Sequence, residues 1–199
     1  MVEHYFTAEP ASADERSTLT VELAGRPVVV HTAPGVFSAG RLDLGTRVLL
    51  RGVPTPPATG HLLDLGCGWG PIALTLALDS PGATVWAVDV NRRALDLLRR
   101  TADGLGLANL HVVEPDDVPD DVSFAAIWSN PPIRVGKEAL HAMLTRWLDR
   151  LDADGEAWLV VQRTLGSDSL ADWLRGQGFA TSKAASAKGY RVLRVEPRR

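Results

Sequence analysis

The chain has 199 residues, of which 45% are hydrophobic and 23% are charged, and its formal net charge is −3. This composition excludes wholesale disorder and predicts a single domain over residues 1–199, with an N-terminal extension over 1–60 and an α/β core over 61–199. The small negative charge gives no overall basic field of the kind that indicates a nucleic-acid-binding protein.

Several other classes of protein are disfavoured by the sequence. No run of about 18 apolar residues is present, so we expect no membrane span. The first ten residues lack the pattern of a signal peptide, and the single cysteine, Cys67, allows no internal disulfide, so a cytoplasmic location is the default expectation. The five histidines do not fall at metal-ligand spacing, and we predict no metal site.

The expected elements follow one another in a simple order. In the extension, apolar alternation over 19–23 and three valines at 28–30 predict a β-hairpin, helical spacing predicts a short helix over 42–50, and prolines over 52–60 indicate a linker. The later strands are expected at 61–65, 84–89, 110–113, 124–128, 156–161, 179–182 and 191–195, and the later helices at 71–79, 92–104, 138–151 and 170–176.

Strands and helices therefore alternate from residue 61 onward. This alternation predicts a Rossmann-like, mostly parallel sheet of seven strands with helices on both faces, together with the small hairpin and helix of the extension. Gly104 is the expected cap of the helix over 92–104. Ligands of such sheets bind at the carboxyl ends of the strands.

A glycine-rich loop follows the first strand of this sheet. Gly66, Gly68 and Gly70 allow a ligand to approach the backbone closely, but they lack the spacing of a dinucleotide site, and no Lys-Ser or Lys-Thr follows as a P-loop requires. Asp64 would repel a phosphate and favour a cationic group such as an ammonium or sulfonium. Asp89, 23 residues after Gly66, is placed to accept both hydroxyls of a ribose. These residues predict an adenosine ligand with a cationic arm; the alternative is a tight turn without a ligand.

A second motif, Asn130-Pro131-Pro132, lies just beyond the expected strand at 124–128. The two prolines remove two backbone N–H donors, so the acceptors that remain are the Asn130 side-chain oxygen and the Pro131 carbonyl. Such a pair can accept both hydrogens of an –NH₂ group and free the nitrogen lone pair for attack on a methyl group. The alternative is a turn that merely ends the strand.

Seven stretches carry a resemblance to a known family: His4-Tyr5-Phe6, Phe37-Ser38, Leu42 to Thr46, Asp64 to Gly68, Asp89, Ser129 to Arg134, and Gly136-Lys137. Through them the chain resembles class I S-adenosylmethionine-dependent methyltransferases that act on amines. More narrowly, it is similar to the small methyltransferase domain of ribosomal RNA guanine-N2 methyltransferases. The resemblance implies S-adenosylmethionine as the cofactor and RNA, such as 16S ribosomal RNA or a small-subunit precursor, as the partner. We also expect a monomer or weak dimer.

The resemblance assigns roles to the matching residues. Those implied for the cofactor are Asp64, Gly66 and Gly68 along the methionine arm, Asp89 at the ribose, Asp116 or Asp117 at the adenine, and Phe37 and Thr46 closing the pocket. Those implied for the substrate are Asn130, Pro131 and Pro132 at the amine, Ile133 at the base, and Arg134 and Lys137 at phosphates, with Arg41, Arg47 and Arg51 as an extension of the basic rim.

The chain departs from the family pattern at Ile133, where many relatives have Tyr or Phe stacked on the base. Ile133 can pack against a ring but cannot stack, and Trp69, Trp128 or Phe37 are alternative sources of an aromatic face. Three other functions stay open: methylation of glutamine N5 in a protein, methylation of adenine N6, and RNA binding without catalysis.

Overall fold

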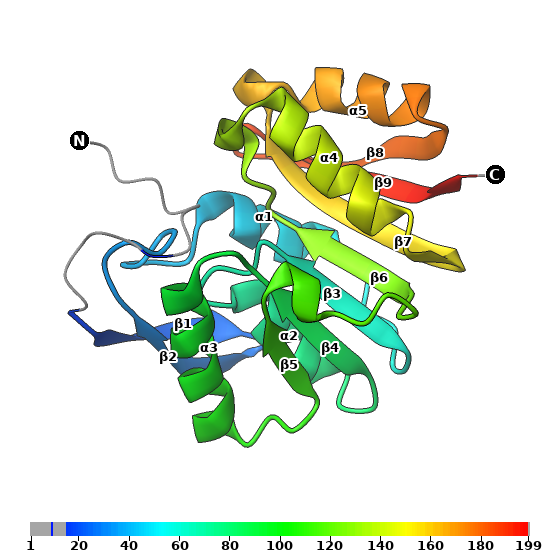
Figure 1. The fold of residues 1–199 in the computed structure, drawn as a ribbon. Helices are drawn as coiled ribbons and strands as arrows, with labels where there is room; N and C mark the ends of the chain where they lie inside the picture. The colour runs from blue at the N-terminus through cyan, green and yellow to red at the C-terminus, as the bar shows by residue number, and fades with distance from the viewer. Residues whose placement is uncertain (1–8, 10–14, 199) are drawn as a thin grey trace.

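The computed structural model describes residue 9 and residues 15–198. Seven strands form one sheet in the order β5-β4-β3-β6-β7-β9-β8 (Figure 1). Their bounds are β3 His61–Leu65, β4 Thr84–Val88, β5 Leu110–Val113, β6 Phe124–Ser129, β7 Leu151–Gln162, β8 Phe179–Ala187 and β9 Tyr190–Arg198. Strands β3 to β7 pair in parallel, and β9 runs antiparallel to β7 and β8. The predicted fold class is therefore confirmed.

Helices cover both faces of this sheet. They are α1 Leu44–Gly52, α2 Pro71–Asp79, α3 Arg92–Leu105, α4 Lys137–Leu148 and α5 Ser167–Gly176, with the 3₁₀ turns η1 Pro115–Asp117, η2 Ile133–Val135 and η3 Arg163–Leu165. One buried apolar cluster joins the sheet to α1, α2 and α3, and a second joins it to α4 and α5. Figure 1 shows α4 in front of β7 and α1 behind β6 and β7.

The predicted hairpin is confirmed as β1 (Ser17–Leu23) and β2 (Arg26–Thr32), which pair antiparallel. Its two turn residues, Ala24 and Gly25, both have positive φ angles, of 51° and 69°, as a tight hairpin turn requires. The buried side chains of the hairpin belong to the same cluster as α2 and α3, and the backbone N–H of His31 donates to Oγ1 of Thr101 on α3 (3.0 Å). The hairpin therefore extends the covering layer on this face of the sheet.

Several predicted boundaries are wrong. The helix expected over 138–151 ends at Leu148, and the next strand begins at Leu151 rather than at 156. The first residues of β7 pair irregularly with β6, with a register shift between the partners of Phe124 and Ala126. The regular apolar alternation of a strand is therefore missing from the start of β7. The cap of α3 is Gly106 (φ 67°) instead of Gly104, since the helix continues to Leu105.

His4-Tyr5-Phe6 lies outside the described residues. Within the described part of the chain, no helix is long and apolar enough to cross a membrane. Over the same residues, no group of three or more His, Cys, Asp and Glu side chains is arranged to hold a metal ion.

Candidate functional site

A cavity of about 550 Å³ opens at the carboxyl ends of the parallel strands, within the size range of small-molecule sites. Strands β3 and β6 are neighbours here although a long segment separates them in sequence, and this reversal of strand order is where open α/β sheets bind ligands. Residues that line the cavity include Phe37, Asp43, Gly66, Gly68, Asp89, Pro115, Asn130, Pro131, Pro132, Ile133, Arg134, Gln162 and Tyr190.

The glycine loop forms one wall of the cavity. Gly66 and Gly68 have φ angles of 76° and 54°, a conformation that side chains disfavour, and the N–H of Gly66 donates to the Val88 carbonyl at 2.9 Å. A Cβ on Gly66 would lie 3.8 Å from Cδ of Pro132, and a Cβ on Gly68 would lie 4.0 Å from Cβ of Phe37. The loop thus presents backbone to the cavity, as predicted for a closely bound ligand.

Gly70 has a different role from the one its position in the loop indicates. A Cβ on Gly70 would lie 2.2 Å from Cδ1 of Leu98, and its φ angle is 91°. Gly70 does not line the cavity. This glycine is therefore required for the close packing of α3 against the loop, and it is not part of the ligand wall.

Asp89 lies in the cavity wall at the end of β4. Its two carboxylate oxygens accept hydrogen bonds from the backbone N–H groups of Gly68 (2.8 Å) and Asn91 (2.9 Å). Burial raises the pKa of Asp89 above its usual value, although backbone hydrogen bonds from Asn91, Gly68 and Val90 offset part of this effect. Each carboxylate oxygen has a further lone pair, so Asp89 can both hold the loop and accept ligand hydroxyls.

Asp64 lies beneath the loop and does not line the cavity, in contrast to its predicted place along the methionine arm. Its Oδ2 accepts from the N–H of Ala73 at 2.8 Å, and its Oδ1 is buried without a hydrogen-bond partner. Burial, followed by a smaller contribution from the charge of Asp89, raises the pKa of Asp64 to about 8, against the hydrogen bond from Ala73. A cationic group above the loop would favour the ionised form of this carboxyl group.

The donor set therefore fits an adenosine ligand with a cationic arm. Backbone without side chains lies at Gly66 and Gly68, a carboxylate lies at Asp89, and an unpartnered buried carboxyl oxygen lies below the loop at Asp64. S-adenosylmethionine combines a ribose, an ammonium and a sulfonium, which match these groups. The chemistry of the residues thus agrees with the cofactor that the sequence implies.

The Asn130-Pro131-Pro132 segment lines the cavity beside the glycine loop, directly after β6. Ser129 ties this strand end to β3, because its Oγ donates to the Leu65 carbonyl at 2.6 Å. The N–H of Ile133 donates to the Pro131 carbonyl at 2.8 Å around Pro132 (φ −75°, ψ 76°), the geometry of an inverse γ-turn. The Pro131 carbonyl keeps a second lone pair, so it can still accept from a ligand amine.

The side chain of Asn130 contacts α1 through its amide nitrogen. Nδ2 donates to Oδ2 of Asp43 at 2.9 Å and to Oγ1 of Thr46 at 3.1 Å. Thr46 is buried, contacts Asn130, and lines a small adjoining pocket together with Phe37, Gly66 and Gly68. Its role in closing the cofactor site stays a prediction. The amide oxygen is the part of Asn130 that remains for a ligand.

The family model for the methyltransferase small domain matches residues 27–194. The chain belongs to this family. The resemblance drawn from the glycine loop and the Asn-Pro-Pro motif is confirmed. Both motifs line the cavity of this methyltransferase small domain.

Relatives of this methyltransferase small domain differ in how much of their length it covers. The uncharacterized protein YbxB of Bacillus subtilis (strain 168) is 34% identical over 98% of this chain and 99% of its own length. Ribosomal RNA small subunit methyltransferase C of Aeromonas hydrophila is 39% identical over 69% of this chain and 41% of its own length. A solved T. thermophilus 16S rRNA N2 G1207 methyltransferase, in complex with AdoMet and guanosine, has a TM-score of 0.80 and 26% identity, covering 95% of this chain and 52% of that one. The chain thus spans about half or less of these two RNA methyltransferases.

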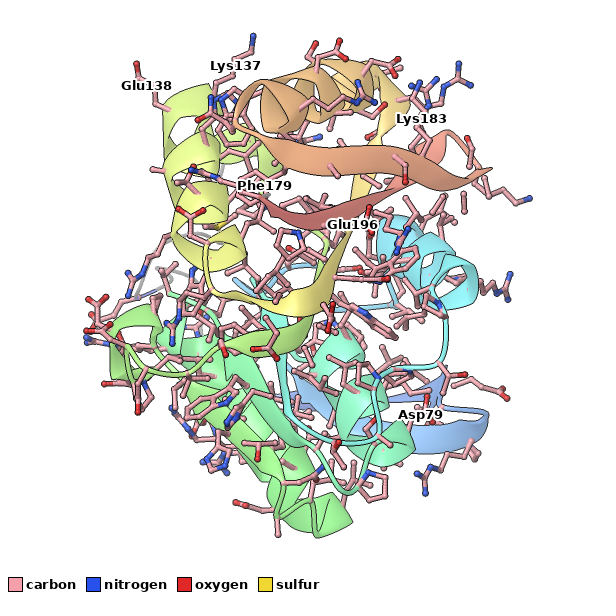
Figure 2. The ribbon with its side chains drawn as sticks, turned by 90° about the vertical axis from the view of Figure 1, so that its right-hand side faces the viewer. Asp79, Lys137, Glu138, Phe179, Lys183 and Glu196 are labelled. Carbon is pink, nitrogen blue, oxygen red and sulfur yellow. The ribbon has the colours of Figure 1, made fainter. Side chains whose placement is uncertain are left out.

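Not every residue predicted for the site lies in the cavity of this methyltransferase domain. Ile133 and Arg134 line it, whereas Lys137 begins α4 and points away from the body of the protein, as Figure 2 shows. Asp116 also lies outside the lining; its side chain is 90% exposed and pairs with Arg146 at 2.9 Å. The neighbouring Pro115 lines the cavity, so this loop adjoins it, and the adenine contact of the loop stays a prediction.

Trp69 and Trp128 are buried in the core and cannot supply an aromatic face to the cavity, whereas Phe37 lines it. Sequence reasoning missed Tyr190, which lines the cavity from the start of β9. Nothing near Tyr190 in the sequence indicates this, since only the antiparallel return of β9 beside β7 brings it to the carboxyl edge. Asp43 was also missed, although the quoted Leu42 to Thr46 stretch contains it.

Proposed function

We propose that this chain is an S-adenosylmethionine-dependent methyltransferase that methylates the exocyclic N2 amine of guanine in RNA, with 16S ribosomal RNA as the substrate. The observation that carries the proposal is that Asn130 and Pro131 line the same cavity as the glycine loop, directly beside it at the carboxyl ends of the adjacent strands β3 and β6. The similarity to ribosomal RNA methyltransferases, including the T. thermophilus 16S rRNA N2 G1207 methyltransferase, supports this choice of substrate.

The cofactor side of the cavity is assigned to the loop and the end of β4. S-adenosylmethionine supplies an electrophilic methyl group on its sulfonium. The backbone at Gly66 and Gly68 accommodates the methionine arm, Asp89 accepts the ribose hydroxyls, and Pro115 lies on the side assigned to the adenine. Phe37, which faces Gly68, closes this part of the cavity.

The target side is assigned to the residues after β6. The lone pair of an aromatic amine is delocalised into the ring, which makes the nitrogen a weak nucleophile. Hydrogen bonds from the amine to Oδ1 of Asn130 and to the Pro131 carbonyl hold both N–H groups and favour a pyramidal nitrogen, whose lone pair then faces the methyl group. The site acts by positioning and electrostatics.

The base is assigned to the part of the cavity lined by Ile133, Gln162 and Tyr190. Tyr190 gives this part an aromatic ring, which compensates for the absence of Tyr or Phe after the prolines. Gln162 adds an amide that can both donate and accept hydrogen bonds, as recognition of a base edge requires. Both residues come from the β7–β9 pair, so the sheet itself supplies the base site.

RNA contact is assigned to cations around this side of the cavity. Arg134 is exposed at the cavity edge, Lys137 follows it on α4, and Arg47 and Arg51 are exposed on α1. Helix α1 adjoins the target side because Thr46 contacts Asn130. Phosphates that flank a nucleotide drawn into the cavity would meet these side chains.

The experiment that tests the proposal is methyl transfer from labelled S-adenosylmethionine to total RNA, isolated ribosomal subunits and a protein extract, each followed by analysis of the methylated product. We expect N2-methylguanosine in RNA. N6-methyladenosine in RNA would show that the target base is adenine, and label on glutamine would show that the substrate is a protein. Absence of both methyl transfer and cofactor binding would favour a non-catalytic module.

A further inference from the structure

Asn130 is held in one orientation by two residues of α1 and its cap. An amide side chain has two N–H donors on nitrogen and acceptors only on oxygen. The Asn130 nitrogen donates to Oδ2 of Asp43 at 2.9 Å and to Oγ1 of Thr46 at 3.1 Å, so both of its hydrogens are in use. A rotation that exchanged oxygen and nitrogen would place the amide oxygen against the Asp43 carboxylate, which repels it.

Asp43 is itself fixed by the helix that it begins. Asp43 is the N-cap of α1, and the oxygen that receives the Asn130 amide also accepts the backbone N–H of Thr46 at 3.1 Å. The segment is tightly packed, because a Cβ on Gly45 would lie 2.8 Å from Cε1 of Tyr190 and 2.9 Å from Oδ2 of Asp43. The start of α1 therefore forms a rigid holder next to the target side of the cavity.

We propose that Asp43 and Thr46 are positioning residues that hold Oδ1 of Asn130 toward the amine to be methylated; this inference rests on the proposed amine methylation. With the nitrogen of the amide committed to α1, only its acceptor faces the cavity, and an N–H group of the substrate meets an oxygen. Donation to a carboxylate also polarises the amide, which makes Oδ1 a stronger acceptor. Helix α1 thereby becomes part of the target site although neither motif lies on it.

The test uses substitutions that keep α1 intact. Asp43→Ser retains a good N-cap but is too short to reach Asn130 as well, and Thr46→Val removes the hydroxyl with little change of shape. Loss of a charge-assisted hydrogen bond predicts that Asp43→Ser lowers kcat by about 10- to 100-fold. The affinity for S-adenosylhomocysteine should stay unchanged, and Asp79→Ser, at the exposed end of α2, serves as the matched control.

Two further measurements separate positioning from general damage. In a double-mutant cycle, Asp43→Ser should add little to the loss already caused by Asn130→Ala; additive losses, or an Asp43→Ser variant with normal kcat, would overturn the proposal. The side-chain ¹⁵N–¹H signals of Asn130 should be protected from exchange in the unmodified protein and exposed in both α1 variants. These signals decide the orientation even if no RNA is methylated, so failure of the positioning role and failure of the proposed function are distinguishable.

Discussion

Replacement of Asp64 by Asn tests how burial controls the charge beneath the glycine loop. Burial raises the pKa of Asp64 from 3.8 to about 8, and the charge of Asp89 contributes in the same direction. Because the pKa in the folded protein lies above that in the unfolded chain, the folded protein keeps a proton that the unfolded chain loses. The stability that this group contributes is complete below about pH 4 and is lost as the pH rises toward 8.

The expected magnitude follows from this shift. Each pKa unit corresponds to about 1.4 kcal/mol, so the whole shift represents roughly 6 kcal/mol of folding free energy between the acidic and alkaline limits. Between pH 6 and pH 8 the linkage relation assigns roughly 2 kcal/mol of lost stability to Asp64. The Asn side chain cannot ionise, and its oxygen can still accept the N–H of Ala73. Asp64→Asn should therefore gain about 2 kcal/mol relative to the unmodified protein over this range.

The assay is urea denaturation of both ligand-free proteins at several pH values between 5 and 9. The difference in the free energy of unfolding should grow with pH and then level off above pH 8. Asp79→Asn, at the exposed C-terminal end of α2 (Figure 2), is the control and should run parallel to the unmodified protein. Parallel curves for the Asp64 variant would show that Asp64 stays ionised when buried, and the argument from burial would be refuted.

Three further predictions concern the proposed reaction. Asn130→Ala should bind S-adenosylhomocysteine normally in calorimetry yet lose at least about 100-fold in kcat, because it removes an acceptor from the reacting amine; normal turnover would contradict the amine site. Asp89→Ala should weaken S-adenosylhomocysteine about 10- to 100-fold, since the ribose acceptor and the bond to Gly68 are both lost; an unchanged Kd would remove the ribose assignment. Combined replacement of Arg134 and Lys137 by Ala should lower the number of counterions released on RNA binding by about two, as read from the slope of log K against log salt concentration. An unchanged slope would place the phosphates elsewhere.

Local backbone chemistry explains what was predictable from the sequence. Glycines allow positive φ and prolines lack an N–H group wherever they occur, and a carboxylate or amide directly after a parallel strand lies at the ligand edge of the sheet. Gly66, Gly68, Asp89 and Asn130 could therefore be predicted as site positions, and all four line the cavity. Alternation of strands and helices was equally informative, because each element must bury one face or stripe. The boundaries around Leu151 failed where an irregular register replaced that regular pattern.

The sequence by itself determined the fold class, the family and the two motifs that line one cavity. Only the tertiary structure decided which atoms of those motifs are available: the contact that orients Asn130 joins it to Asp43, 87 residues away, through a helix whose position depends on packing against β7 and β9. Tyr190 enters the cavity because the last strand returns antiparallel, and Asp116 lies outside the lining, exposed and paired with Arg146. Such contacts depend on the relative placement of distant elements, which local sequence patterns do not encode.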